Sequence, residues 1–407
     1  MASPSETAHK LHARIAPAEV LVDERRTLYR LAVDLFAPGT ELSDNLVDHP
    51  IVRYEIGRAL AGHGLDVGRL HEVAALGVRH AGLLVAADPR SADLLEAPLR
   101  IIAPPGVTIR PLTEADGERF EAVLQVVADG IRLFRELAPE AADDLLPHVS
   151  MLAVLKRETS GGVVSASSRY VPGIVLIDEP SLPIEVAEAL VHEGAHEKFF
   201  DFAITREFLD ARAEDVEFFE TSWSHARWPL EQTFAAWHAY SCLAQFALAC
   251  EGQSLGKDSL LPKARERAAE IGDWLLAHEH DLGPGARWLL RAIADEPASL
   301  ASDVDGAASP VAIDRDGKFH VVPDIRLRRA ATGRGVVGRA AQPPEVFWLD
   351  DDTSWLLSQL PDDGTPMAVE RMVSKAVEEW QVAEATAERR LEISLDSLLR
   401  SSLVMQT

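Results

Sequence analysis

The sequence has little cysteine and no long hydrophobic run. Its two cysteines, Cys242 and Cys250, lie in one apolar stretch. Their spacing fits neither a disulfide framework nor a zinc knuckle, so both are expected to be small core residues. No apolar run is long enough to span a membrane, and the N-terminus lacks the charged start and apolar segment of a secretion signal. The sequence therefore predicts a cytoplasmic protein that does not enter a membrane.

Positive charge is also scarce. Lysine and arginine number 40 against 65 aspartates and glutamates, which gives a formal net charge of -25. Such a chain is repelled by nucleic acids and by anionic membranes, so neither is expected as a partner. At 407 residues the chain can bury its own cores without disulfides or structural metals. A metal ion, if one is bound, would therefore serve chemistry.

The spacing of hydrophobic residues divides the chain into three expected regions. Residues 1–140 should be helical, residues 141–300 should form the functional core, and residues 301–407 should form a C-terminal α/β appendage. The expected fold class is α+β and predominantly helical, with a small sheet beside a zincin-like helix that carries the motif described below.

Individual elements follow from shorter patterns. A strand is predicted at 107–112, and β-rich runs predict strands at 151–156, 173–178, 318–330 and 345–350. Helices are predicted from Pro183 to about 203, after Pro229, at 258–279, and as one long helix from Met367 to about Leu399.

The stretch ALVHEGAHEKFF, residues 189–200, contains a His-Glu-x-x-His motif formed by His192, Glu193 and His196. On a helix, residues four apart share one face and lie roughly 6 Å apart along the axis. The two imidazoles can therefore point to one metal ion, and neutral imidazole suits zinc or ferrous iron. The motif predicts a metal site with His192 and His196 as two of its ligands.

The third ligand must come from elsewhere in the chain. Metzincin peptidases place a histidine six residues after the second motif histidine, where this chain has Phe202, so that class is excluded. The helix after Pro229 offers Glu231, as in gluzincin peptidases, and also His238 in its apolar part. These two lie about 10 Å apart along the axis, so one metal cannot easily take both. We favour His238 and keep Glu231 as the alternative.

Several flanking segments carry a resemblance to a known family. They comprise Ser165, Ser167 and Ser168, Pro172-Gly173, the run 188–193, Trp223, Arg227-Trp228-Pro229 and His238. Over roughly 160–250 the chain resembles HExxH-motif peptide-modification proteins, described as 2-oxoglutarate-dependent peptide β-hydroxylases. Proteins of that family act on ribosomally made precursor peptides.

The resemblance implies a ferrous iron centre held by His192, His196 and His238, with open positions for 2-oxoglutarate and O2. A cation is then needed for the far carboxylate of 2-oxoglutarate, and the bidentate fork of arginine is suited to that task. Arg227 and Arg169 are the candidates, with Ser167 of the serine-rich segment as a further cofactor-binding residue. Glu193 would hold a ligand or a bound water, and the substrate would be a precursor peptide.

Two other functions remain open. In a zinc metallopeptidase, Glu193 would be the general base that activates a metal-bound water, and Tyr240 or His225 would stabilise the tetrahedral intermediate. A non-catalytic scaffold would instead capture an acidic precursor peptide through arginines of the C-terminal region. Those arginines are Arg326, Arg328, Arg329, Arg334 and Arg339.

Overall fold

The computed structural model describes residues 17–73, 78–102, 108–206, 208–210, 218–293, 317–340, 345–361 and 363–407. The chain divides into two compact units. The first comprises Met1–Arg25, Leu42–Gly57 and Asp66–Ala298, and the second comprises Arg26–Glu41, Arg58–Leu65 and Ser299–Thr407. Residues on both sides of the predicted boundary at position 140 belong to the first unit.

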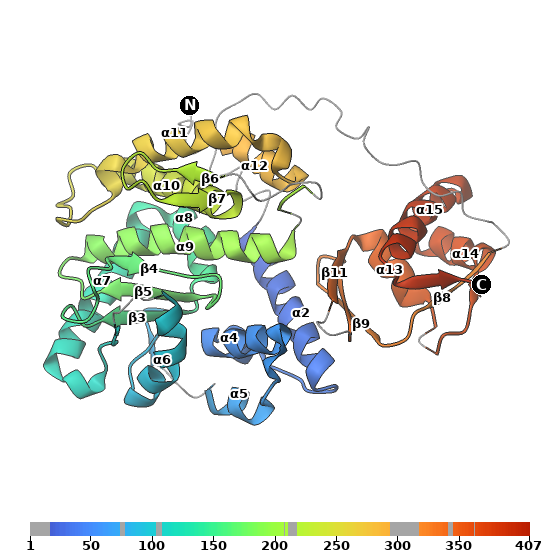
Figure 1. Cartoon of the computed structure of the whole chain (residues 1–407), viewed down its shortest axis with the longest axis horizontal. Helices are drawn as coiled ribbons and strands as arrows, with labels where there is room; N and C mark the ends of the chain where they lie inside the picture. Colours follow the sequence, from blue (N-terminus) through green and yellow to red (C-terminus); the bar gives the residue numbers. More distant parts are fainter. Residues whose placement is uncertain are drawn as a thin grey trace. The chain divides into compact units, whose positions relative to one another are not determined.

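Helices dominate, and the strands form small sheets, which confirms the predicted α+β class (Figure 1). The N-terminal helices are α2 (Ala18–Phe36), α3 (Asp44–Val47), α4 (Pro50–Arg58), the π-helix η1 (Ala59–His63), α5 (Val67–Val73) and α6 (Pro89–Ile102). They are followed by η2 (Glu114–Asp116), α7 (Glu118–Leu137), α8 (Pro139–Leu145) and η3 (Leu146–His148). No helix within the described ranges is long and apolar enough to cross a membrane.

The sheet of the first unit has five strands in the order β1-β2-β3-β5-β4. The predicted strands at 151–156 and 173–178 are confirmed as β3 (Met151–Leu155) and β5 (Ile174–Asp178), which pair in parallel. All residues of β3 are buried, as expected for a strand covered on both faces. The outer strands are β1 (Val78–His80), β2 (Leu83–Val85) and β4 (Ser165–Ala166), the last antiparallel to β5 at one edge.

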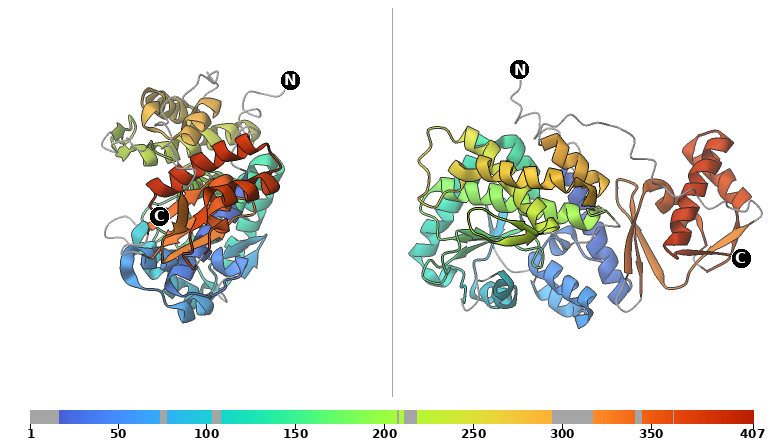
Figure 2. Two further views of the ribbon diagram at one scale, coloured as in Figure 1. Left: turned by 90° about the vertical axis from the view of Figure 1, so that its right-hand side faces the viewer. Right: turned by 45° about the horizontal axis from the view of Figure 1, so that its top comes forward.

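Helix α9 (Pro183–Thr205) confirms the helix predicted around the motif. Pro183 opens it, and the Glu185 carboxylate accepts hydrogen bonds from the backbone N–H groups of Ser181 and Leu182 at 2.7 and 3.1 Å. It packs against β5, α7 and α10, so most of its residues are buried. Figure 1 and the right-hand view of Figure 2 show α9 between the strands and helix α10.

Close packing of α7 on α9 depends on Gly130. A Cβ atom at that position would lie 2.5 Å from Cβ of Val186 and 2.7 Å from the carbonyl oxygen of Pro183. No larger residue fits without moving one helix. The glycine therefore allows α7 to support the first turns of the helix that carries the motif.

The remaining elements of the first unit follow α9. The hairpin of β6 (Phe218–Glu220) and β7 (Arg227–Pro229) leads into α10 (Leu230–Ala249), which begins directly after Pro229 as predicted. The helix predicted at 258–279 is α11 (Leu261–Ala277). After it come η4 (Glu279–Asp281) and α12 (Pro284–Ile293).

A buried ionic network fixes the C-terminal half of α9. The guanidinium of Arg25 donates to Asp201 at 2.5 Å and to Asp48 at 2.9 Å, while His148 Nδ1 lies 2.6 Å from the Asp201 carboxylate. Arg25 and Asp201 are almost completely buried. A charge removed from water is costly unless it is paired, so the loss of any one of these side chains should destabilise the fold.

The second unit combines two antiparallel sheets with helices. One sheet has the order β11-β10-β9 and the other β12-β8-β13. The strands are β8 (Lys318–Val321), β9 (Ile325–Arg329), β10 (Gly335–Arg339), β11 (Glu345–Leu349), β12 (Met367–Ala368) and β13 (Val404–Gln406). The helices are α13 (Asp351–Gln359), α14 (Val369–Trp380) and α15 (Glu384–Arg400).

Two sequence predictions are wrong in detail. The long helix expected from Met367 to about Leu399 is two helices, because Gln381 adopts the left-handed conformation at φ 52° and ends α14. The strand expected at 107–112 does not form over the described residues 108–112, where Pro111 makes a single bridge with Leu155. Proline lacks the N–H that a strand ladder requires.

Most arginines of the proposed basic surface already have partners in the second unit. Arg339 pairs with Glu345, Arg328 lies 3.4 Å from Glu41, and the guanidinium of Arg334 stacks over the ring of Trp348 at 5.1 Å. Within the described residues, these contacts give three of the five arginines a partner in their own unit, and the precursor-peptide scaffold stays a prediction.

Candidate metal centre

Helix α9 brings the two motif histidines together. The ring centroids of His192 and His196 lie 4.8 Å apart, with the ring planes at 83°. Both side chains line a cavity of about 500 Å³ in the first unit. The residues lining it are Ala166, Ser167, Ser168, Arg169, Tyr170, His192, Glu193, His196, Phe200, Pro229, Glu231 and Gln232.

Both imidazoles are in the protonation state that metal binding requires. Burial, with a smaller contribution from Arg267, lowers the pKa of His192 to about 4. Burial, and then the neighbouring His192, lowers the pKa of His196 to about 4 as well. Each ring is therefore neutral at pH 7 and has a lone pair to offer.

The Nδ1 atom of His192 is buried and has no hydrogen-bond partner in the described part of the protein. Buried polar atoms without a partner are uncommon and call for an explanation. An imidazole nitrogen without a partner in the protein is free to bind a group from outside the chain, such as a metal ion. These features fit a divalent metal ion that prefers nitrogen ligands.

Glu193 is held by two serines of the segment that contains β4. The Ser165 hydroxyl donates to Oε1 and the Ser167 hydroxyl to Oε2, each at 2.6 Å. The side chain of Glu193 is buried among these partners. The prediction placed Ser167 at the cofactor site, and the structure brings it both to the cavity and to Glu193.

Glu231 and Arg169 share the cavity with the histidines. Glu231 lies in the first turn of α10, and its Oε1 accepts a hydrogen bond from Arg169 Nη1 at 2.7 Å. Arg169 also donates to the Tyr170 hydroxyl at 3.1 Å. The hydrogen bond that Arg169 donates to Glu231 is the main cause that raises the pKa of Arg169 above its ordinary value. Arg169 thus lines the same cavity as the motif histidines, and its role in binding a carboxylate stays a prediction.

His238 does not reach this cavity. Its Nδ1 lies 2.9 Å from the carbonyl oxygen of Ala195, on the side of α9 that packs against α10, and its Nε2 lies 4.0 Å from Cys242 Sγ. The ring is buried in the helix interface, and the cavity lining does not include it. In this structure His238 therefore does not lie at the cavity of His192 and His196, where the expected third ligand would have to be.

Arg227 also lies outside the cavity lining. It is exposed on β7, and its guanidinium stacks over the Phe218 ring at 4.9 Å. His225 is exposed and lies 3.4 Å from Glu220. In the hairpin, both side chains contact residues of β6, and the spacing of the sequence could not show this.

Tyr240 lies beside His192 and is hydrogen-bonded to Arg267, a residue that the sequence did not indicate as part of the site. The ring of Tyr240 lies 5.5 Å from that of His192, and its hydroxyl accepts a hydrogen bond from Arg267 at 2.7 Å. Arg267 also stacks over Trp223 at 4.7 Å. Arg267 lies on an ordinary amphipathic helix, so nothing in its local sequence distinguishes it from a surface arginine.

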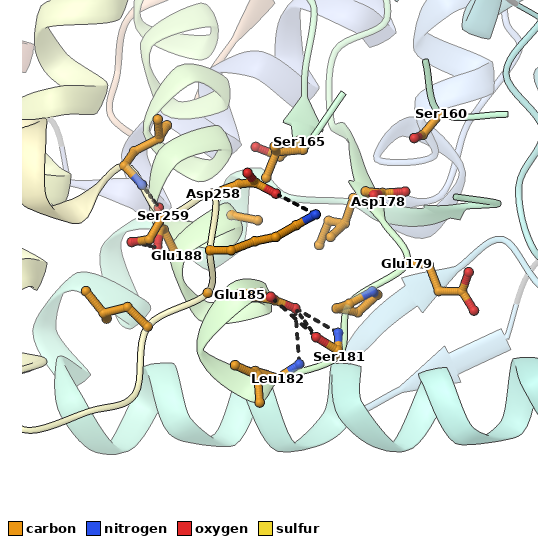
Figure 3. A pocket seen from close by; sticks show the side chains of 18 of the residues that line it. Ser160, Ser165, Asp178, Glu179, Ser181, Leu182, Glu185, Glu188, Asp258 and Ser259 are labelled. Carbon is orange, nitrogen blue, oxygen red and sulfur yellow. Dashed lines mark hydrogen bonds and ion pairs between the residues drawn. The ribbon is translucent and has the colours of Figure 1, made fainter. Parts of the chain in front are cut away.

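A second cavity, of about 800 Å³, shares His192 with the first. Figure 3 shows several of its carboxylates, including Glu185 bonded to Ser181 and Leu182, and Glu188 beside Ser259. Burial raises the pKa of Glu188. Ser165 lines this larger cavity while its hydroxyl reaches Glu193 in the smaller one. The two cavities therefore meet at His192 and β4.

Within the described ranges, no three His, Cys, Asp or Glu side chains stand close enough to hold a metal ion as they are placed. The histidine pair and Glu231 line one cavity, but Glu231 is held by Arg169. No protein-family model and no curated protein sequence matches this chain.

Proposed function

We propose that this protein is an Fe(II)- and 2-oxoglutarate-dependent hydroxylase that modifies a peptide in the cytoplasm. His192, His196 and Glu231 would hold the iron, since two histidines and one carboxylate are typical ligands of non-haem iron in oxygenases. When bound, iron with 2-oxoglutarate and O2 supplies the oxidising power that converts a peptide C–H bond to C–OH, yielding succinate and CO2. Arg169 would hold the far carboxylate of 2-oxoglutarate.

The observation that carries this proposal is that Ser165 and Ser167 hydrogen-bond both carboxylate oxygens of Glu193. In a peptidase, the glutamate of this motif must turn a carboxylate oxygen toward a metal-bound water and accept its proton. Here both oxygens accept short hydrogen bonds from Ser165 and Ser167. A carboxylate fixed in this way suits a residue that orients its surroundings better than one that takes up and releases protons.

The larger cavity supports a peptide as the substrate. Its volume of about 800 Å³ is sufficient for several residues, and it adjoins the proposed iron site at His192. We propose that a ribosomally made precursor peptide lies there, with the reacting residue directed past His192 into the smaller cavity. In this arrangement the polypeptide binds and orients the substrate, while the buried α9 keeps water from the far side of the histidines.

One observation favours a second candidate, a zinc metallopeptidase. Two histidines and a glutamate are also the ligands of one large class of zinc peptidases, and Glu231 lines the same cavity as the motif histidines. Tyr240, whose ring lies 5.5 Å from that of His192, would then be a candidate for stabilising the developing oxyanion. The peptidase is the weaker candidate because Glu193, which would be its general base, is already hydrogen-bonded to Ser165 and Ser167.

The two functions differ in metal and in co-substrate. Metal-free protein is loaded with Fe(II) or Zn(II) and incubated in air with 2-oxoglutarate and a mixture of unfolded peptides. We expect succinate only with Fe(II), and peptides heavier by one oxygen atom. Peptide cleavage with Zn(II), without any consumption of 2-oxoglutarate, would show that the hydroxylase proposal is wrong. His192→Ala should abolish both kinds of turnover.

A further inference from the structure

Glu231 lines the cavity of the motif histidines but is bound to Arg169. Its Oε1 lies 2.7 Å from Arg169 Nη1. As placed, no three potential ligands in the described part of the chain come together around a metal position. To serve as a third ligand, the Glu231 side chain would therefore have to move toward the histidines, away from the position in which it binds Arg169.

The ion pair is of a kind that can be exchanged. The side chain of Glu231 is 27% exposed and that of Arg169 is 49% exposed. Pairs with this much solvent contact contribute at most about 1 kcal/mol, because water and salt screen them. A divalent cation already held by two neutral histidines attracts a carboxylate more strongly than a single solvated guanidinium does.

Arg169 keeps an anchor when Glu231 leaves. Its Nη2 donates to the Tyr170 hydroxyl at 3.1 Å, and its guanidinium lies 5.1 Å from the centre of the Tyr170 ring. Tyr170 lines the same cavity. The guanidinium would thus stay at the cavity wall, and the group that matches its donors best is another carboxylate.

We propose that the Arg169–Glu231 ion pair is exchanged when the site is filled, so that Glu231 turns to the metal and Arg169 binds the distal carboxylate of a dicarboxylate co-substrate. This inference rests on the proposed function. Each ligand then prepares the site for the other, because the metal removes Glu231 from Arg169 and the dicarboxylate prevents Arg169 from recapturing it. Binding of the two ligands is coupled, and the coupling is reciprocal.

The first test measures Co(II) binding to metal-free protein by titration. Arg169→Gln removes the competitor for Glu231 and should tighten Co(II) binding by about two- to fivefold, which corresponds to the strength of such an ion pair. Arg227→Gln is the matched control, since it removes an equal charge from the neighbouring hairpin and should change the affinity by less than about twofold. Unchanged or weaker Co(II) binding by Arg169→Gln would overturn the exchange.

A double-mutant cycle separates exchange from simple repulsion between Arg169 and the metal. If the two residues exchange, Arg169→Gln should no longer tighten Co(II) binding once Glu231→Gln is present. A gain of the same size in both backgrounds would mean that Arg169 only repels the cation, and the proposal would be wrong.

The second test compares 2-oxoglutarate with 2-oxobutyrate, which lacks the distal carboxylate, on Co(II)-loaded protein. Wild type and Arg227→Gln should bind 2-oxoglutarate at least about tenfold more tightly, because only 2-oxoglutarate has a distal carboxylate that can form charge-assisted hydrogen bonds with Arg169. Arg169→Gln should lose most of that preference, and a retained preference would overturn the role of Arg169. If His192→Ala and His196→Ala bind Co(II) like wild type, the proposed metal centre itself fails, which is a separate result.

Discussion

The Ser167 hydroxyl donates a hydrogen bond to Oε2 of Glu193 at 2.6 Å, which ties the edge strand segment of the sheet to the motif helix. Ser165 makes the matching bond to Oε1. The glutamate that identifies a peptidase in most His-Glu-x-x-His proteins is thus held by neighbours that such a motif does not include. Its role depends on a contact between α9 and the segment around β4.

Removing these serines should destabilise the protein. Ser165→Ala or Ser167→Ala leaves one oxygen of a buried carboxylate without its donor, at a cost of about 1–3 kcal/mol each. Urea unfolding followed by circular dichroism measures the change. Ser168→Ala is the control, because Ser168 lines the same cavity but is not bonded to Glu193, and it should cost under about 0.5 kcal/mol.

Glu193→Gln distinguishes the two proposed reactions. A hydroxylase in which Glu193 only orients its neighbours should keep a measurable fraction of 2-oxoglutarate turnover, because an amide can still accept a hydrogen bond from one serine. A peptidase should lose almost all activity with its general base. Turnover and bound metal are measured on the same preparation, and complete inactivity with metal intact would favour the peptidase.

His238→Ala should reduce stability while leaving metal binding intact. The buried ring fills space between α9 and α10, so its loss should cost about 2–4 kcal/mol. Co(II) affinity should change by less than about threefold, whereas His192→Ala or His196→Ala should weaken it by more than about a hundredfold. His238→Gln, which is close to histidine in volume and keeps an N–H for the Ala195 carbonyl, serves if the alanine variant does not fold. Loss of Co(II) from a folded His238 variant would restore His238 as a ligand.

Arg25→Met should be strongly destabilising. It leaves Asp201 buried and without its main cationic partner, which typically costs about 3–5 kcal/mol. Arg100→Met, which breaks the exposed pair with Glu96 on α6, should cost less than about 1 kcal/mol. Equal midpoints of chemical unfolding for the two variants would contradict the importance of the buried network.

The same network predicts a pH dependence of stability. Burial lowers the pKa of His148 below its ordinary value of 6.5, although Asp201 acts in the opposite direction. As the pH falls below 6.5, the unfolded chain takes up a proton at this residue that the folded chain does not, so stability is lost. His148→Gln should show a smaller loss of unfolding free energy between pH 7 and 5.5 than wild type. An unchanged pH slope would show that His148 is not the responsible group.

The sequence alone determined the elements that depend on local pattern. The start of α9 at Pro183, the strands β3 and β5 and the start of α10 after Pro229 all followed from proline, from hydrophobic runs and from helical spacing. The pairing of His192 with His196 also followed, because residues four apart on a helix share a face whatever surrounds them. The break at Gln381 did not, since a left-handed residue other than glycine gives no clear signal in the sequence.

Only the tertiary structure decided which distant residues join the motif. Glu231 and His238 lie on the same side of α10, two turns apart, and the way α10 crosses α9 brings the first to the cavity and buries the second against Ala195. The serines that hold Glu193 lie in and directly after β4, the strand that pairs with β5, and Arg169 follows them. Such contacts arise from packing between elements far apart in the chain, so no local spacing specifies them.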